Sequence, residues 1–335
     1  MPDYTVKLEP HGLSFKAHEG ETILNAARRA GLWLAFECGW GDCGTCKLAL
    51  KEGEVENLFP EAPAIKPQDE RRNRILVCQS AARSNLVLQV KKKDLNSPRE
   101  DLPTKDHRGT LAASEVLGPG IQRLSFTLEG PANFIPGQYA MVELAPRLRR
   151  AYLIANPPGE EKVEFIVRYK EEGAASEHLF GLANGDHLPI ELPYGADYYR
   201  ESNRTPVLIA CGAGVASILS MLRWLRMQDG QREKPRYVFY GAPSPEELVL
   251  LDELEELADH LGAELLPAIE HPHSGWRGMV GTVQRVIENS LPTPWEEYTF
   301  YAAGPSSAVD PVSSMLKNAG IRVTRIRAEG FGPGS

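Results

Sequence analysis

Four cysteines give the clearest chemical signal in this sequence. Cys38, Cys43 and Cys46 have the spacing C-x4-C-x2-C, and Cys78 stands 32 positions after Cys46. Thiolates bind iron and zinc, and this spacing is typical of proteins that hold a [2Fe–2S] cluster on four cysteines. Three glycines in the same loop would let backbone N–H groups approach the sulfurs: Gly39, Gly41 and Gly44. The spacing therefore predicts a [2Fe–2S] cluster on these four cysteines.

Two other uses of the cysteines fit the sequence less well. Structural zinc sites usually have two short C-x2-C-like pairs, whereas this chain has one such pair and single cysteines. A thioredoxin-like C-x2-C would need a βαβ context, which is missing around Cys43 and Cys46. The fifth cysteine, Cys211, ends an apolar stretch, which favours a buried core thiol.

The composition is typical of a globular protein and limits the classes of function. The chain has 335 residues, 42% of them hydrophobic and 24% charged, which is enough for two or three domains. Its net charge of −8 gives no basic surface for nucleic acid or an anionic membrane. The N-terminus shows no secretory signal, and the apolar stretch 206–225 contains Pro and Gly as a strand, glycine loop and helix would. We expect a cytoplasmic protein with neither nucleic acid nor membrane as a partner.

The hydrophobic pattern divides the chain into three segments and a linker. Residues 1–95 combine alternating stretches with one helical pattern, which predicts a small β-rich domain. Residues 91–108 are dense in charge and contain two prolines, as a solvated connector would. Short strand patterns with Gly/Pro turns over 105–202 predict a small antiparallel barrel or sandwich. Residues 203–335 alternate strand and helix patterns, which predicts a parallel nucleotide-binding sheet wrapped in helices.

These segments, in this order, resemble a known family. The first resembles a plant-type ferredoxin domain of β-grasp fold, and the other two resemble the flavin β-barrel and the nicotinamide-binding domain of the ferredoxin–NADP reductase superfamily. The whole chain resembles the reductase components of bacterial multicomponent oxygenases that attack aromatic rings. "GEVENLFPEAP" and "GPANFIPGQY" are similar to the branch that serves carbazole-type dioxygenases and toluene-type monooxygenases. The resemblance implies a multidomain α+β and α/β protein.

The family's flavin motif R-x-Y-S-x-x-N reads "RAYLIAN" here. The resemblance implies that Arg150 contacts the FAD pyrophosphate, that Tyr152 stacks on the isoalloxazine, and that Asn156 closes the motif, with Ala151 between them. A planar guanidinium suits a diphosphate because it makes two charge-assisted hydrogen bonds. Leu153 replaces the usual Ser near flavin N5. A backbone contact would survive that change and a side-chain contact would not, so the change bears on hydride transfer and not on FAD binding.

A second flavin element and the C-terminus complete the implied flavin site. "IVRYKEEGAASEHL" resembles the family's segment around the ribityl chain and pyrophosphate, which implies contacts from Val167, Arg168, Tyr169, Gly173, Ala175 and Ser176. A hairpin followed by a capped helix would have the same pattern without a ligand. "RAEGF" resembles the tail behind the flavin, so Phe331 would be the ring there and Glu329 the acidic neighbour of the nicotinamide. The implied catalytic residues are Tyr152, Leu153 and Glu329.

Three loops resemble the family's nicotinamide site. "CGAGVA" resembles a G-G-x-G-x-x-P loop, with Cys211 in the first glycine position and Ser217 in that of the proline. "YAAGP" resembles a Cys-Gly-Pro loop, with Ala303 in place of the Cys. Together with the end of "VFYG", these loops imply contacts from Gly212, Ala213, Gly214, Val215, Tyr240, Gly241, Ala303, Gly304 and Pro305.

The residues after Gly241 bear on the choice of coenzyme. A 2′-phosphate needs Arg or Lys, whereas Gly241 is followed by Ala-Pro-Ser-Pro-Glu-Glu. The absence of a base and the presence of Glu246 and Glu247 favour NADH over NADPH. Alternatively, both glutamates only occupy the first turn of a helix, where acidic side chains suit the helix dipole.

The resemblance implies an NAD(P)H-dependent oxidoreductase with FAD and a [2Fe–2S] cluster. Electrons would pass from NADH through FAD and the cluster to an oxygenase component, or to a small Rieske or plant-type ferredoxin, of a Rieske-type aromatic-ring dioxygenase system. Alternatives are the reductase of a soluble diiron aromatic monooxygenase, a reductase without an oxygenase, and a non-catalytic electron carrier with a decayed nicotinamide site. The departures at Leu153, Cys211 and Ala303 keep the last alternative open. The sequence does not indicate the aromatic substrate, because a reductase never binds it.

Overall fold

The chain forms two compact units, Met1–Pro103 and Thr104–Ser335, in a computed structural model. The division falls within the predicted linker 91–108, and the finer boundaries at 95, 105 and 202 stay predictions. The structure describes residues 3–36, 39–41, 43–95, 102–145, 148–228 and 234–331.

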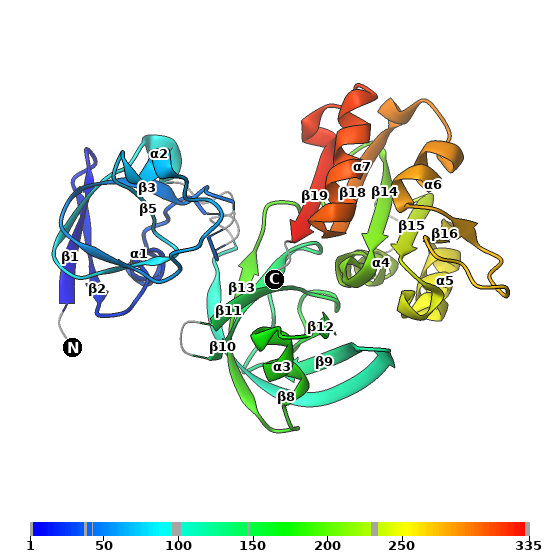
Figure 1. Cartoon of the computed structure of the whole chain (residues 1–335), viewed down its shortest axis with the longest axis horizontal. Helices are drawn as coiled ribbons and strands as arrows, with labels where there is room; N and C mark the ends of the chain where they lie inside the picture. The colour runs from blue at the N-terminus through cyan, green and yellow to red at the C-terminus, as the bar shows by residue number, and fades with distance from the viewer. Residues whose placement is uncertain are drawn as a thin grey trace. The chain divides into compact units, whose positions relative to one another are not determined.

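The first unit is a mixed five-stranded sheet crossed by one helix (Figure 1). The sheet order is β2-β1-β7-β3-β5, with β1 and β7 parallel and the other neighbours antiparallel. Its strands are β1 (Asp3–Glu9), β2 (Leu13–His18), β3 (Lys47–Glu52), β5 (Arg74–Leu76) and β7 (Leu86–Gln89). The remaining elements are α1 (Ile23–Arg29), α2 (Pro67–Glu70), the short pair β4 (Val55–Asn57) and β6 (Ser80–Ala82), and the 3-10 turn η1 (Lys92–Asp94). The predicted β-grasp fold is confirmed.

The helix α1 explains how this small unit acquires a core. Thr22 caps it, because its Oγ1 accepts a hydrogen bond of 3.2 Å from the backbone N–H of Asn25. Its Ile23, Leu24, Ala26 and Ala27 are buried against the sheet. The sheet supplies alternating inward residues such as Val6 and Leu8, as period-2 strands do.

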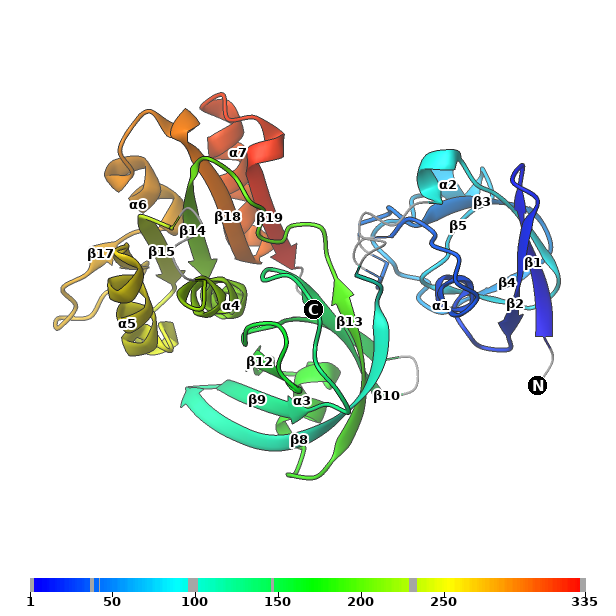
Figure 2. The ribbon, with the colours of Figure 1, turned by 180° about the vertical axis from the view of Figure 1, so that it is seen from behind.

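The second unit begins with the predicted antiparallel barrel. Its sheet order is β11-β10-β13-β8-β9-β12, and all neighbouring strands are antiparallel. The two outer strands come together through an isolated bridge between Ile154 and Phe165, which curls the sheet. The elements are β8 (Lys105–Gly118), β9 (Ile121–Thr127), β10 (Tyr139–Ala145), β11 (Leu148–Leu153), β12 (Lys162–Arg168), α3 (Ala174–Phe180) and β13 (His187–Tyr194). The helix α3 lies beside the strands of the barrel (Figure 2), and its Leu179 belongs to the barrel core.

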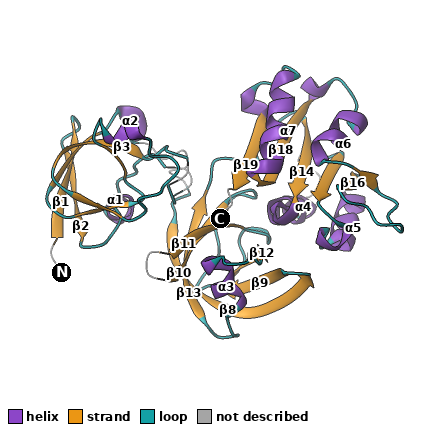
Figure 3. Cartoon of the chain, viewed as in Figure 1, coloured by secondary structure: helices purple, strands orange, loops and turns teal. Residues whose placement is uncertain are grey.

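A parallel sheet follows, with the order β17-β16-β15-β14-β18-β19. Helices α4 and α5 pack together, as do α6 and α7 (Figure 3). The strands are β14 (Thr205–Cys211), β15 (Tyr237–Ala242), β16 (Glu264–Ile269), β17 (Met279–Val280), β18 (Tyr298–Pro305) and β19 (Ile326–Phe331). The helices are α4 (Val215–Arg226), α5 (Leu251–Leu261), α6 (Val283–Ser290) and α7 (Ser306–Asn318). The 3-10 turns are η2 (Gly212–Gly214), η3 (Pro245–Glu247), η4 (Trp295–Glu297) and η5 (Val323–Arg325).

The apolar stretch 206–225 forms β14, η2 and most of α4, as the sequence predicts. Among the helices of the described residues, none is long and apolar enough to cross a membrane.

The helix α4 holds the barrel and the parallel sheet together. Ser220 donates a hydrogen bond of 2.7 Å from Oγ to the carbonyl oxygen of Asn156 in the barrel. One turn later, Arg223 Nη1 lies 2.7 Å from Glu164 Oε2 on β12, and its Nη2 lies 2.6 Å from Glu253 Oε1 on α5. Burial opposes the charge of Glu164, but the hydrogen bonds from Lys162 and Arg223 outweigh it and hold the pKa of Glu164 below its usual range. This network fixes how the two halves of the second unit meet.

Candidate functional site

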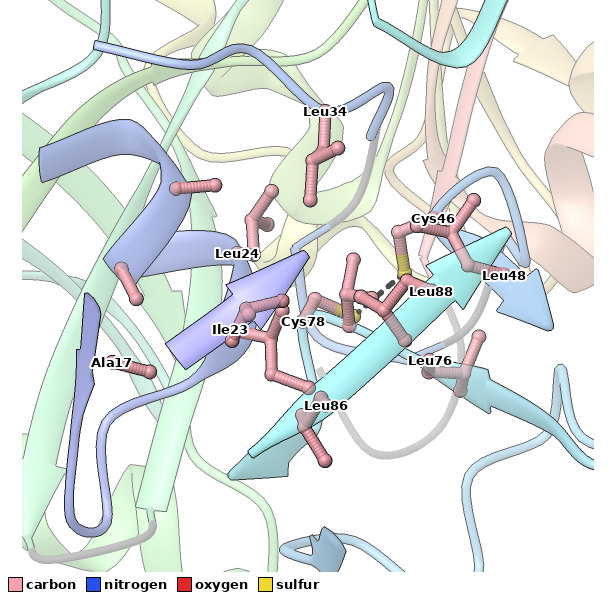
Figure 4. Close-up of a cluster of buried hydrophobic side chains, with 14 of the residues drawn as sticks. Ala17, Ile23, Leu24, Leu34, Cys46, Leu48, Leu76, Cys78, Leu86 and Leu88 are labelled. Atoms are coloured by element: carbon pink, nitrogen blue, oxygen red, sulfur yellow. Dashed lines mark hydrogen bonds between the residues drawn. The ribbon is translucent and has the colours of Figure 1, made fainter. Parts of the chain in front are cut away.

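The described cysteines of the first unit lie on the loop before β3 and in the turn between β5 and β6. Cys46 and Cys78 are buried, and their sulfurs are 3.1 Å apart without a disulfide (Figure 4). Cys43 is exposed, and its sulfur accepts a hydrogen bond of 3.5 Å from the backbone N–H of Thr45. The fourth predicted ligand, Cys38, lies outside the described residues.

The pair fits two thiolates on one iron. Sulfurs about 2.3 Å from a tetrahedral metal lie about 3.8 Å apart, so Cys46 and Cys78 need only a small separation to share an iron. The hydrogen bond with Cys78 lowers the pKa of the Cys46 thiol in spite of its burial, which favours the thiolate that a metal requires. In the described part of the chain, no three His, Cys, Asp or Glu side chains are grouped as a single metal ion would need.

Glycines shape the cysteine loop. Gly39, Gly41 and Gly44 all have positive φ, at 70°, 103° and 73°. A Cβ on Gly41 would also lie 3.1 Å from the Cβ of Ala62 and from the Cγ of Gln79. The loop therefore needs glycine for its backbone conformation, and at Gly41 also for space.

A cavity of about 380 Å³ lies in the second unit, where the barrel meets the C-terminal ends of β14 and β19. Its volume is within the range of small-molecule and cofactor sites. Twelve residues that the sequence implied for FAD or nicotinamide line it: Arg150, Ala151, Tyr152, Leu153, Val167, Arg168, Gly173, Ala175, Ser176, Ala213, Glu329 and Phe331. The topology thus brings together three segments that are far apart in the sequence.

Arg150 provides a test of whether this cavity suits a diphosphate. Its Nη1 donates a hydrogen bond of 2.9 Å to the carbonyl oxygen of Arg149, but its buried Nε has no hydrogen-bond partner among the residues that the structure describes. An unpaired buried N–H of a charged group is costly unless a ligand satisfies it. A guanidinium with a free donor in the cavity wall fits the pyrophosphate of FAD.

Tyr152 and Leu153 form an apolar part of the wall. The ring of Tyr152 lies 5.7 Å from that of Phe165, and burial raises the pKa of Tyr152 well above its usual range. The phenol therefore stays protonated and can only donate or accept as a neutral hydroxyl. Leu153 is 9% exposed and lies opposite Tyr139 in the register of β10 and β11.

The two glycine loops of the parallel sheet touch each other. A Cβ on Gly214 would lie 1.9 Å from the carbonyl oxygen of Ala303, and one on Gly304 would lie 2.5 Å from the Cβ of Cys211. Cys211 is 3% exposed, and burial raises the pKa of its thiol to about 12, so the predicted core thiol is confirmed. This close packing leaves Ala213 at the cavity and places Gly214 beneath the second loop.

Comparisons with known proteins identify the domains and the family of this chain. The family models of a 2Fe-2S iron-sulfur cluster binding domain, an oxidoreductase FAD-binding domain and an oxidoreductase NAD-binding domain match residues 6–83, 108–199 and 208–313. The "Phenol hydroxylase P5 protein" of Acinetobacter pittii is 32% identical over 98% of this chain and 94% of its own. "Ferredoxin--NAD(P)(+) reductase CarAd" of Metapseudomonas resinovorans is 31% identical over 93% and 95%.

A solved structure, "Ferredoxin reductase in carbazole 1,9a-dioxygenase", has a TM-score of 0.87 at 28% identity and covers 98% of both chains. The chain belongs to the family of ferredoxin–NAD(P) reductase components of oxygenase systems. The predicted cofactors of this reductase, a [2Fe–2S] cluster, FAD and NAD, are confirmed by its three matched domains.

Some predicted site residues of the reductase lie away from the cavity. Asn156 is fully buried and makes its hydrogen bonds within the protein: Nδ2 donates to the carbonyl oxygen of Lys162 at 3.0 Å, and Oδ1 accepts from the backbone N–H of Glu164 at 2.9 Å. Asn156 therefore shapes the turn between β11 and β12. Tyr169 is 42% exposed and packs edge-on against Phe180. Other predicted residues also lie outside the cavity lining: Gly212, Gly214, Val215, Tyr240, Gly241, Ala303, Gly304 and Pro305.

The second flavin element of the reductase is held by Ser176. Its Oγ donates toward the carbonyl oxygens of Lys170 and Gly173, both at 3.0 Å, and accepts from the backbone N–H of Lys170 at 3.0 Å. A Cβ on Gly173 would lie 2.9 Å from that Oγ. The hydroxyl of Ser176 is thus used to fold the turn before α3. Sequence reasoning missed five residues of the cavity wall: Tyr139, Ile166, Lys170, Glu172 and Ala174.

One ion pair bears on the choice of coenzyme. Arg168 on β12 pairs with Glu247 in η3, although the two residues are far apart in the sequence. No base directly follows Gly241 along the chain, as the sequence shows, but the fold pairs Glu247 of that stretch with an arginine of the barrel. Tyr240 is fully buried, and its hydroxyl donates to the carbonyl oxygen of Glu247 at 3.3 Å, which positions η3 beside this ion pair.

Proposed function

We propose that this reductase oxidises NADH and passes the electrons through FAD and its [2Fe–2S] cluster to the oxygenase component, or to a small ferredoxin, of an aromatic-ring-oxidising system. The observation that carries the proposal is the cavity of the second unit. It unites the flavin residues of β11, β12 and α3 with Ala213 and Glu329 of the nicotinamide half. The predicted cytoplasmic location is also part of this proposal.

The roles of individual residues follow from their surroundings. When bound, FAD supplies the conversion between two-electron and one-electron transfer. Arg150 binds the diphosphate through its unpaired Nε. Tyr152, held neutral by burial, orients the ring system, and the apolar side chain of Leu153 excludes water from the reacting face. Glu329 lines the same cavity from β19 and orients the nicotinamide.

NADH is the proposed coenzyme, and the pair between Arg168 and Glu247 is the reason. A guanidinium already paired with a carboxylate is less available to a 2′-phosphate. We expect kcat/KM to favour NADH over NADPH by about tenfold. Replacing Glu247 by Gln frees Arg168 and should shift the ratio toward NADPH, and an unchanged ratio would argue against this reason.

The relatives divide between two partner types. Their names include "Phenol 2-monooxygenase, reductase component DmpP" from Pseudomonas sp. and "Naphthalene 1,2-dioxygenase system ferredoxin--NAD(P)(+), reductase component" from Pseudomonas putida. A Rieske-type dioxygenase system is the proposed partner, and the diiron monooxygenase is the second candidate, favoured by the similarity to the phenol hydroxylase protein. Stopped-flow transfer from the NADH-reduced reductase to each purified oxygenase type tests the choice, since only the true partner should accept electrons rapidly.

One experiment distinguishes the proposed reductase from a non-catalytic electron carrier. Anaerobic addition of NADH should bleach the flavin absorbance of the purified protein within the time of mixing. Bleaching by dithionite but not by NADH would show that the protein cannot transfer electrons from NADH to its flavin, and would contradict the proposal.

A further inference from the structure

A second cavity lies at the edge of the parallel sheet where its strands begin, opposite to the edge that carries the glycine loops. Its volume is about 280 Å³, and it is lined near the first residues of β14, β18 and β19. The glycine loop η2 follows the last residue of β14, and a strand of seven residues separates these two edges by about 20 Å. The arrows of β14 and β19 in Figure 1 end at the side of the sheet that faces the barrel. It is therefore distinct from the flavin and nicotinamide sites.

Five arginines surround this second cavity, against a single carboxylate, that of Glu201: Arg200, Arg204, Arg322, Arg325 and Arg327. Among the residues that the structure describes, none of the five forms an ion pair with a carboxylate. Four of them donate to backbone carbonyl oxygens instead. For example, Arg204 Nε and Arg325 Nη1 both reach the carbonyl oxygen of Glu296, at 3.2 and 3.0 Å.

This arrangement differs from that of two buried arginines in the same unit. Arg149 pairs with Glu191 at 2.7 Å, and Arg223 pairs with both Glu164 and Glu253. Like charges brought together without carboxylates repel one another, and a fold tolerates them where an anionic ligand neutralises them. Guanidinium groups match phosphate oxygens with two parallel hydrogen bonds each.

Hydrogen bonds and ring stacking hold Tyr301 and Arg200 together at the wall of the cavity. The hydroxyl of Tyr301 accepts a hydrogen bond of 3.1 Å from the backbone N–H of Arg200 and donates one of 3.1 Å to its carbonyl oxygen. The ring of Tyr301 stacks on that of Tyr199 at 5.3 Å. Arg200 and Arg204 belong to the connection between β13 and β14, while Arg327 lies on β19. A ligand held by both groups would fasten the connection to the sheet.

We propose that this cavity binds a small anion with a di- or triphosphate group. Its size suits a compact ligand, and the excess of positive charge suits one with several negative charges. The proposal concerns a binding site that the transfer of electrons does not require, so its failure would leave the proposed function untouched.

Calorimetric titration of the purified holoprotein with inorganic pyrophosphate tests this site. Saturating NAD⁺ is present throughout, so that the coenzyme site is filled. One pyrophosphate should bind per chain, and its affinity should fall as NaCl is raised. Arg322→Gln should weaken it by about tenfold, the scale of a lost charge-assisted hydrogen bond. Arg322 is exposed and donates no hydrogen bond within the described part of the chain, so the variant should fold normally.

The matched control is Arg236→Gln, an exposed arginine just before β15 at the same edge of the sheet but outside the cavity lining. It should bind pyrophosphate as the natural protein does. A second variant, Arg204→Gln, should weaken binding from the other side of the cavity. Equal affinities in all four proteins, or no pyrophosphate signal in the presence of NAD⁺, would overturn the proposal.

Discussion

Replacing Arg150 by glutamine is expected to loosen FAD without unfolding the reductase. Within the described part of the chain, the buried Nε of Arg150 has no partner, and the side chain makes one hydrogen bond, of 2.9 Å, to a backbone carbonyl oxygen. The variant therefore loses little internal stability. It also loses charge-assisted hydrogen bonds to the diphosphate. Because glutamine retains one hydrogen-bond donor, we expect a net loss of about 2–3 kcal/mol in the free energy of FAD binding. The dissociation constant of FAD should rise by about 30- to 150-fold.

The neighbouring Arg149 provides a matched control for this prediction. It lies on the same strand but pairs with Glu191 at 2.7 Å and does not line the cavity. Arg149→Gln should lower the melting temperature while it leaves FAD affinity within about threefold, an effect below 1 kcal/mol. Fluorescence titration of deflavinated protein gives the affinities, and circular dichroism gives the melting temperatures. The reasoning is refuted if Arg150→Gln binds FAD normally, or if both variants lose FAD equally.

Three further predictions concern the structure of the second unit. Arg223→Met should lower the free energy of unfolding by about 2–4 kcal/mol, because it removes one of the two cations that pair with the buried carboxylate of Glu164 and leaves only Lys162 there among the described residues. Arg226→Met on the same helix removes only an exposed pair and should cost less than about 1 kcal/mol in urea unfolding. The natural protein should have a higher free energy of unfolding than Glu164→Gln above about pH 4.3. This difference should disappear as the pH falls through the lowered pKa of Glu164 in the folded protein, and a difference independent of pH would contradict the prediction. Gly214→Ala should abolish reduction by NADH while FAD stays bound, because its Cβ would lie 1.9 Å from the carbonyl oxygen of Ala303, and normal NADH kinetics would show that the loops are not packed as described.

Local patterns predicted those parts of the fold and site that depend on neighbours in the sequence. The spacing of Cys43 and Cys46 indicated a metal-binding loop, and the buried position of Cys46 beside Cys78 fits that prediction. The stretch "PVLIACGAG" indicated a strand and a glycine turn, which are β14 and η2. These features follow from side-chain type and local backbone geometry, so one sequence suffices to predict them.

Features that depend on distant residues escaped prediction. The role of Asn156 depends on a turn that ends at Glu164 and on Ser220 of α4, so its motif position suggested a ligand contact that the structure does not place at the cavity. The pair of Arg168 with Glu247 joins two elements that only the folded chain brings together. The sequence also did not predict that five arginines gather at the second cavity, because residues 200–204 and 322–327 become neighbours only through the strand order of the sheet.

An anaerobic NADH titration of the purified reductase tests the central claim most directly. Flavin and iron–sulfur absorbance are recorded at each addition. Both should bleach, and more than one NADH per chain should be consumed, because FAD takes two electrons and the cluster takes a further one. Cys78→Ser should lose the cluster signal and consume about one NADH per chain, since only FAD remains. Bleaching of neither cofactor by NADH, with dithionite reducing both, would contradict the account.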